Sequence, residues 1–316
     1  WSHLFVNMTM PYDWELRVGR FAVDFEGDNG LYTDNDALFG DYRTDGFRIT
    51  KKWNNFKATG IIGRNDSRDN NTYDAEAWER YVPGSFMNYA LDLNYTGEKF
   101  FIGGTGYWWQ YDGEKDGDDT DFNVANYALY AGYKFTPAIA LKGIYYWQSL
   151  GDDIKEALRQ ADGNTSPNAW KVILDIKQDA LKFTSLWVEY SQEDNTFEGI
   201  HDRYSIGGGE KDYVGRNWAY ADPNGTSKWW FATAKQQWND KWSTFLRYAN
   251  VNYDTEGLDN ATEWGIGVGY QYTPAVYFEL AFDQVDHGNT DEYVDYKEGL
   301  AQGKDHVIRF RTNVSF

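Results

Sequence analysis

The chain has 316 residues, of which 49 are acidic and 30 basic, and its formal net charge is −19. This acidic excess excludes nucleic acid as a partner and argues against a polybasic role at a membrane surface. The sequence contains no cysteine, which excludes disulfide and thiolate chemistry.

Aromatic residues make up 19% of the sequence, yet the mean hydropathy is only −0.72. A transmembrane β-barrel reconciles the two values, because its outward residues are apolar, its inward residues are polar and aromatic girdles lie at both interfaces. A secreted all-β protein with an aromatic platform for carbohydrate is the alternative that composition leaves open. No apolar run approaches 18 residues, so no transmembrane helix is expected.

Hairpins follow one another along the chain, and each ends in a longer polar loop. The short turns between their strands hold Pro or Asn, which suit tight turns. The segment IKEALRQ, within the loop 149–167, predicts a short helix. The expected strand pairs are 2–10 with 14–23, 46–53 with 56–63, 86–95 with 100–111, 123–135 with 138–148, 168–177 with 181–190, 228–238 with 242–253, and 263–272 with 275–285, before a last strand at 305–316.

Apolar and polar residues alternate along these strands. In the strand at 168–177, for example, the apolar Trp170, Val172 and Leu174 alternate with Lys171, Asp175 and Lys177. A period of two indicates a strand with two unlike faces. Charged residues in the middle of the strand indicate that the inner face is wet, so we expect a water-filled lumen rather than a packed core.

The last twelve residues, DHVIRFRTNVSF, alternate strictly and end on the aromatic Phe316. This ending resembles the C-terminal strand of bacterial outer-membrane barrels. Short turns at one end and long loops at the other are typical of the same class. We therefore expect a single all-β domain over 1–316, a transmembrane antiparallel up-and-down β-barrel. About 15 strands can be counted, and the even parity of such barrels favours 16, with 18 as the alternative; an N-terminal strand and any periplasmic tether would then lie outside this chain.

An acidic segment at 21–45 follows the strand that contains WELRVGRF. It resembles the constriction loop of porins, which folds into the barrel and faces basic residues on the wall. That resemblance implies that Asp28, Asp34, Asp36 and Asp41 narrow a pore near Arg17, Arg48 and Lys52. A solvated outer loop is the alternative. The acidic residues of the segment are Asp24, Glu26, Asp28, Asp34, Asp36, Asp41 and Asp45.

Further charged residues share the inward parity and are expected to line the pore wall. A wall of mixed sign suits broad passage of small polar solutes, and the acidic excess predicts a mild cation preference. These residues are Lys142, Lys171, Lys177, Arg247, Glu279, Asp283, Arg309 and Arg311.

No catalytic or metal-binding motif accompanies this pattern. The four histidines have no metalloprotease spacing and no nucleophile elbow is present, so an enzyme is not expected. No cofactor is expected either. The segment 112–121 has an oxygen-rich composition that suits Ca²⁺ but lacks the spacing of an EF-hand loop.

Taken together, the hairpin rhythm, the terminal Phe316 and the acidic segment resemble the outer-membrane porin superfamily. The DGFRI strand after the acidic segment is similar to the barrel of the S-layer-homology (OmpM-type) porins of diderm Firmicutes. The resemblance implies a homotrimer in the outer membrane of a diderm bacterium, in contact with lipid and lipopolysaccharide. The expected function is passive diffusion of small hydrophilic solutes and ions, with a substrate-specific oligosaccharide channel and a secreted carbohydrate-binding protein as alternatives.

Overall fold

A computed structural model describes residues 3–33, 37–65, 86–111, 114–115, 118–119, 121–197, 214–215, 217–288 and 301–315. Within these residues, fifteen strands form one antiparallel sheet in which each strand pairs with its neighbour in the chain. The strands are β1 (Leu4–Met10), β2 (Trp14–Val23), β3 (Tyr42–Trp53), β4 (Phe56–Asn65), β5 (Phe86–Thr96), β6 (Phe100–Tyr111), β9 (Val124–Thr136), β10 (Ile139–Leu150), β11 (Asn168–Ile176), β12 (Ser185–Asp194), β13 (Thr226–Gln237), β14 (Trp242–Asn252), β15 (Ala261–Thr273), β16 (Val276–Asp286) and β17 (Lys304–Val314).

The remaining elements are short. A separate two-stranded sheet joins β7 (Glu114–Lys115) to β8 (Asp118–Asp119). The helices are α1 (Phe25–Asp28), α3 (Asp152–Gln160) and α4 (Gln178–Leu181), with 3₁₀ turns at Pro11–Asp13 and Trp218–Tyr220. The helix expected from IKEALRQ is therefore confirmed as α3. Among the described residues, no helix is long and apolar enough to cross a membrane.

Short turns join the strands at one end of the sheet, which we call the turn end. Between β3 and β4 the turn is Asn54-Asn55, where Asn54 adopts a left-handed backbone with φ 50°. Asn tolerates this conformation better than most residues, so the turn closes without a glycine. Pro137 and Ala138 form an equally short connection between β9 and β10. Both turns lie at the positions predicted from the sequence.

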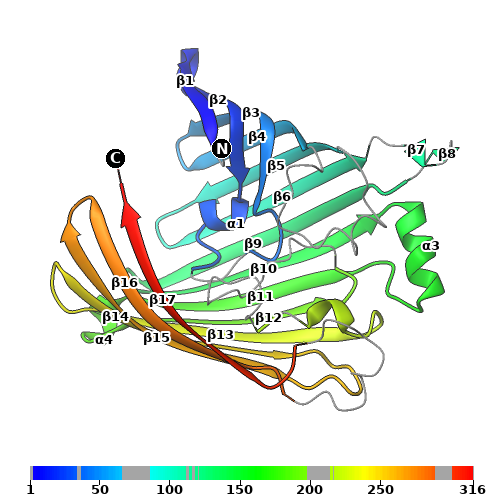
Figure 1. Ribbon diagram of the computed structural model, residues 1–316. Coiled ribbons are helices and arrows are strands. Elements are labelled where there is room, and N and C mark those ends of the chain that lie inside the picture. The colour runs from blue at the N-terminus through cyan, green and yellow to red at the C-terminus, as the bar shows by residue number, and fades with distance from the viewer. Residues whose placement is uncertain are drawn as a thin grey trace.

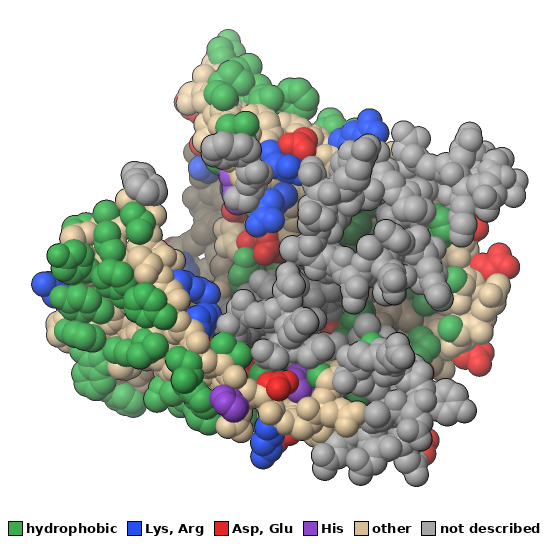
Figure 2. All heavy atoms as spheres, in the orientation of Figure 1, with side chains coloured by type: hydrophobic (Ala, Val, Ile, Leu, Met, Phe, Trp, Pro, Cys, Tyr) green, Lys and Arg blue, Asp and Glu red, His purple; other side chains and the backbone are tan. Residues whose placement is uncertain are grey.

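The sheet curves so that α1 lies on its concave side, as Figure 1 shows. Its outer face carries exposed apolar side chains along nearly every strand, including Leu129 (61% exposed), Ile266 (52%) and Phe310 (67%). In Figure 2, hydrophobic side chains cover the surface over β14 to β17 at the left of the view. An apolar surface this extensive requires an apolar environment, which lipid supplies.

The expected fold class is confirmed as an all-β, antiparallel, up-and-down sheet. The described strands number fifteen, as the hairpins indicated, against the 16 favoured from parity. Among the described residues, β1 pairs only with β2 and β17 only with β16, so these two strands form the edges of the sheet.

The inner face differs from the expected wet lumen. A cluster of buried apolar side chains fills the part of the interior near the long loops, and it includes Phe21, Tyr107, Tyr146, Trp229 and Phe231, each at most 1% exposed. The expectation of a lumen without a packed core is therefore wrong for this part. The reason is that aromatic residues also occupy inward positions. Alternation of polar and apolar residues shows which side chains point inward, but it does not show whether those side chains face water or pack together.

Candidate functional site

The segment between β2 and β3 folds against the inner face of the sheet. Its apolar residues Phe25, Leu31, Leu38 and Phe39 are each at most 1% exposed. The ring centroids of Phe25 and Phe39 lie 5.4 and 4.9 Å from that of Tyr107 on β6. Burial of such side chains is the main force that holds a loop without a regular scaffold in place. We call the described residues 24–33 and 37–41 the inward loop.

Asp24 begins the short helix α1 and shapes the first turn of the loop. Its carboxylate accepts hydrogen bonds from the backbone N–H of Gly27 (2.7 Å) and the hydroxyl of Tyr32 (2.6 Å). This is the role of an N-cap residue. Burial of the carboxyl group outweighs both hydrogen bonds and raises the pKa of Asp24 to about 6.

Glu26 anchors the inward loop to the opposite wall. Its carboxylate lies 2.5 Å from Nζ of Lys171 on β11, and both side chains are fully buried. The hydroxyl of Tyr146 on β10 and the backbone N–H of Phe39 donate hydrogen bonds of 2.9 and 3.1 Å to the other carboxylate oxygen. A buried carboxylate is tolerated only when a cation and hydrogen-bond donors surround it, and this site supplies both.

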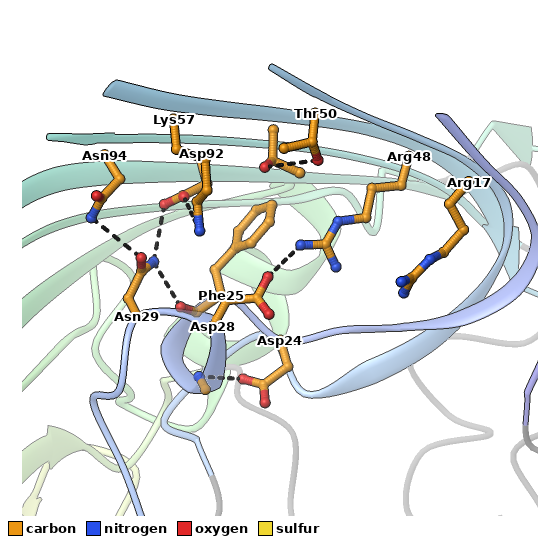
Figure 3. Close-up of polar contacts among 12 residues, drawn as sticks. Arg17, Asp24, Phe25, Asp28, Asn29, Arg48, Thr50, Lys57, Asp92 and Asn94 are labelled. Atoms are coloured by element: carbon orange, nitrogen blue, oxygen red, sulfur yellow. Dashed lines mark hydrogen bonds and ion pairs between the residues drawn. The ribbon is translucent and has the colours of Figure 1, made fainter. Parts of the chain in front are cut away.

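Asp28 lies close to two arginines of the wall. Arg17 on β2 and Arg48 on β3 are register partners, so their like charges stand directly opposite each other. Asp28 accepts a charge-assisted hydrogen bond from Arg48, and in Figure 3 both arginines extend from the strands toward the loop. Its negative charge offsets the repulsion between the two cations. The contact with Arg48 therefore holds Asp28 of the loop against the basic part of the wall.

Asn29 connects the same turn to β5. Its amide donates to the backbone oxygen of Phe25 (2.8 Å) and to the carboxylate of Asp92 (3.4 Å), and Asn94 donates back to Asn29 (3.3 Å). Figure 3 shows Asn29 pointing toward Asp92 and Asn94. On the far side of the loop, Nζ of Lys142 donates to the carbonyl oxygen of Gly30 at 2.8 Å. The loop is therefore bonded to strands on both sides of it.

A cavity of about 630 Å³ lies under α1 at the turn end. Asp28 and Asn29 line it, together with turn residues such as Asn54, Asn55 and Pro137. Lysines of β3, β4, β9, β10 and the segment after β11 surround it. We call this cavity the turn-end vestibule; its lysines are Lys52, Lys57, Lys134, Lys142 and Lys177.

The other acidic residues of the expected constriction loop have different places. Asp45 belongs to β3 and is exposed, with a carboxylate oxygen 3.7 Å from Arg20. Asp41 is half-buried at the end of the inward loop. Asp34 and Asp36 lie outside the described residues. Of the expected acidic set, Asp24, Glu26 and Asp28 fix the position of α1, through contacts within the loop and with the wall.

The basic residues expected on the wall do lie on the inner face, but in two groups. Lys142 and Lys177 share one partner, Asp175, with each Nζ 3.0 Å from a carboxylate oxygen. Lys171 binds Glu26 as described above. Lys52 lies 3.5 Å from Glu15, and both side chains are largely exposed.

The second group lies on β14 to β17, away from the inward loop. Arg309 stands 3.5 Å from Glu279 and 3.6 Å from Asp283. Glu279 and Arg311 are register partners on β16 and β17, and Arg247 on β14 is largely buried. This part of the wall carries charges of both signs, as the inward parity of these residues indicated.

Several contacts at this site were not anticipated from the sequence. Tyr146, Glu189 and Asp92 have inward parity but no motif, and Asn29 was one polar residue among many in the acidic segment. Tyr146 could have been recognised as an inward residue, because the residues before and after it in the chain are apolar and point outward. No local signal pairs Glu26 with Lys171, because their contact depends on how the sheet curves. The segment 112–121, considered for Ca²⁺, contributes to the described residues only β7, β8 and Asp121.

No protein-family model and no curated protein matches this chain. Solved structures to which it is similar include three proteins of Pseudomonas aeruginosa. The outer membrane protein OprD aligns with a TM-score of 0.55 and 12% identity over 95% of this chain and 75% of that one. OccK3 (OpdO) gives a TM-score of 0.57 at 10% identity, over 95% and 76% of the two chains. OccD3 (OpdP) gives 0.54 at 14%, over 95% and 74%.

At these identities the likeness establishes the fold. This chain has the fold of an outer-membrane β-barrel protein. The apolar outer face and the up-and-down topology agree with that fold, and both support the expected location in the outer membrane.

Proposed function

We propose that this protein is an outer-membrane porin through which small hydrophilic solutes and ions diffuse passively, with the inward loop as its constriction. The observation that carries the proposal is the position of that loop. It is bonded to the inner face of a sheet whose outer face is apolar, through Glu26, Asp28 and Asn29. A loop held inside a barrel narrows the cross-section available to solutes, and the charges beside it act on whatever passes.

The lining of the turn-end vestibule supports passage of polar solutes. Its wall presents amide side chains, lysines and Asp28, and these groups hydrate readily. The apolar cluster on the other side of the loop makes the route narrower than a wide, wet pore would be. The proposal is therefore a restricted diffusion channel with no chemical step.

The alternative of an oligosaccharide channel depends on aromatic rings that a sugar can stack on. Inward aromatics are present, but Tyr107, Tyr146 and Trp229 are at most 1% exposed. Rings buried in the apolar cluster have no free face for a sugar, so this alternative gains no support from them. The secreted carbohydrate-binding protein would place Leu129, Ile266 and Phe310 in water, at a large hydrophobic cost.

The finer parts of the proposal follow the resemblance in sequence. They comprise a homotrimer, contact with lipopolysaccharide and kinship with the S-layer-homology porins. The sequence features that support them are the succession of hairpins and the strand DGFRI. Chemical cross-linking of the protein in native membranes tests the trimer directly.

The test of function is single-channel recording in a planar bilayer. The purified, detergent-folded protein is expected to insert and give stable conductance in KCl. Deleting the inward loop, residues 25–40, while leaving β2 and β3 intact, is expected to raise that conductance. A folded protein that inserts without conducting would refute the porin proposal, and a loop deletion that leaves conductance unchanged would refute the role of the inward loop as its constriction.

A further inference from the structure

Three arginines lie on the outer face of the sheet near the end opposite the turn end, which we call the loop end. They are Arg20 on β2, Arg43 on β3 and Arg64 on β4. Arg43 and Arg64 are exposed, and the residues that follow them, Thr44 and Asn65, are buried in the interior. Because side chains alternate between the two faces along a strand, both arginines point outward. The three strands are neighbours in the sheet, and we call these residues the outer arginine group.

Strand pairing places the outer arginine group around a single carboxylate. Asp45 on β3 is the register partner of both Arg20 and Arg64, and Arg20 lies 3.7 Å from it. Arg43 is two residues nearer the loop end on the same strand, which places it about 7 Å from Asp45 along the face. Within β2, β3 and β4, which the structure describes in full, Asp45 is the one acidic residue on the outer face. The loop end of this face therefore carries three positive charges and one negative charge.

Two outward lysines at the same end of the sheet are each matched by a carboxylate. Lys228 on β13 lies 3.3 Å from Asp254, and Lys304 on β17 lies 3.2 Å from Asp286. The outer arginine group differs from these pairs in the ratio of its charges and in the kind of cation. The planar guanidinium of arginine presents paired N–H groups that fit two oxygens of a phosphate, whereas a lysine acts as a point charge. This group is therefore suited to a phosphate.

An apolar surface lies directly beside the outer arginine group, on the side towards the middle of the sheet. One step nearer the turn end on the same face stand Val18, Phe47 and Ile62, and Phe47 is the register partner of the other two. Phe47 is 57% exposed and Ile62 is 52% exposed. Cations above an exposed apolar surface match a lipid, whose anionic headgroup lies above its acyl chains. A small soluble anion would need the cations alone.

We propose that the outer arginine group binds a phosphate group of an outer-leaflet glycolipid, with Arg43 and Arg64 as its main contacts and with the acyl chains lying on Phe47 and Ile62. The long loops of outer-membrane barrels are extracellular, so the group lies at the level of the outer headgroups, where an outward arginine is tolerated. This inference rests on the lipopolysaccharide contact proposed above and gives that contact a site on three strands. It does not depend on conduction, because Arg43 and Arg64 point away from the interior.

The experiment is native mass spectrometry of the detergent-folded protein with added lipid A, the phosphorylated glycolipid anchor of lipopolysaccharide. The wild-type protein is expected to bind lipid A more tightly than lipid A from which the phosphates have been removed. Arg43→Gln and Arg64→Gln each remove a charge-assisted hydrogen bond to phosphate, so each is expected to weaken lipid A binding about tenfold. Arg43→Lys keeps the charge but loses the paired N–H groups, so its loss should be smaller. Circular dichroism confirms that each variant is folded before binding is compared.

Arg159→Gln is the matched control. Arg159 is an exposed arginine in the last turn of α3, also at the loop end, and Figure 1 shows α3 well apart from β2, β3 and β4. The substitution removes the same charge and should leave lipid A binding unchanged. Equal losses for Arg159→Gln and Arg43→Gln, or equal binding of the lipid without phosphates, would overturn the phosphate site. A protein that binds lipid A through Arg43 but does not conduct would support the site and refute the porin function.

Discussion

Lys171 on β11 lies between Glu26 of the inward loop and Glu189 of β12. Its Nζ is 2.5 Å from Glu26 and 3.9 Å from Glu189, and all three side chains are fully buried. The two contacts are therefore unequal in distance but depend on the same charge. Removing the lysine and removing one carboxylate should have different consequences.

Lys171→Met is expected to destabilise the protein by about 3–5 kcal/mol, because it leaves the buried carboxylate of Glu26 without the cation that lies against it. Glu26→Gln leaves Lys171 paired with Glu189 and should cost less, about 1–3 kcal/mol. Thermal unfolding in detergent, followed by circular dichroism, measures both. Equal losses, or a larger loss for Glu26→Gln, would contradict the shared-cation arrangement.

The raised pKa of Asp24, about 6 in the folded protein against an ordinary value of 3.8, makes docking of the inward loop depend on pH. The folded state holds a proton that the unfolded state releases, so the stabilisation is fully present below about pH 4 and is lost as pH rises through 6. Asp24→Asn removes this dependence. Relative to wild type, it should gain up to about 3 kcal/mol in unfolding free energy at pH 7 and nothing at pH 4.

Asp28→Asn is the control for that measurement. It removes the ion pair with Arg48 and should lower stability at pH 7, opposite in sign to Asp24→Asn. Chemical unfolding at pH 4 and pH 7 gives both differences. A gain for Asp24→Asn that is the same at the two pH values would exclude titration of this carboxyl group as the cause.

Gly40 lies at the end of the inward loop, where its backbone has φ +93° and a Cβ atom would come within 2.3 Å of the Tyr107 hydroxyl. Gly40→Ala should therefore combine backbone strain with a steric clash and loosen the loop, costing about 2–4 kcal/mol. Gly303→Ala separates the two effects, because φ is +70° there but no atom lies within 4 Å. Its expected cost is only about 1 kcal/mol, and the comparison is made by thermal unfolding with conductance as a second measurement.

Leu129→Arg tests whether the outer face contacts lipid. Leu129 is 61% exposed on β9, so in water the substitution would be almost neutral. In a bilayer it should cost about 2–4 kcal/mol if the position is near the midplane. Asp240→Arg, in the exposed turn after β13, is the control and should be tolerated. Folding of the variants into lipid vesicles measures the difference, and equal yields would count against a lipid-facing surface.

The regular parts of this structure were accessible from sequence, because they depend on local periodicity. The alternation of Trp170, Val172 and Leu174 with charged residues identifies β11 and its two faces. The Asn54-Asn55 turn is equally local, since its conformation depends on the residues in the turn. Antiparallel neighbours then follow from short connections.

The site was accessible only in part, because its contacts are not local. The composition of the acidic segment suggested a loop beside basic strands, but nothing in the sequence shows which carboxylate meets Lys171. The apolar cluster was missed for a related reason. Tyr107 and Tyr146 occupy positions that a polar tyrosine in a wet wall could also occupy, and packing against residues such as the docked Phe39 makes them part of a core.

The hydrogen bond between Tyr146 and Glu26 joins residues 120 positions apart in the chain. A contact of this span closes only after the intervening strands have paired, since loop-closure entropy opposes it until then. The inward loop precedes β10 and β11 in the chain, so it can dock fully only after these strands have paired. Until then Phe25 and Phe39 lack part of their packing surface. Assembly should thus proceed in two stages, pairing of the wall and then docking of the loop. During that interval the apolar side chains of the inward loop are exposed, which makes the partly assembled chain prone to aggregation.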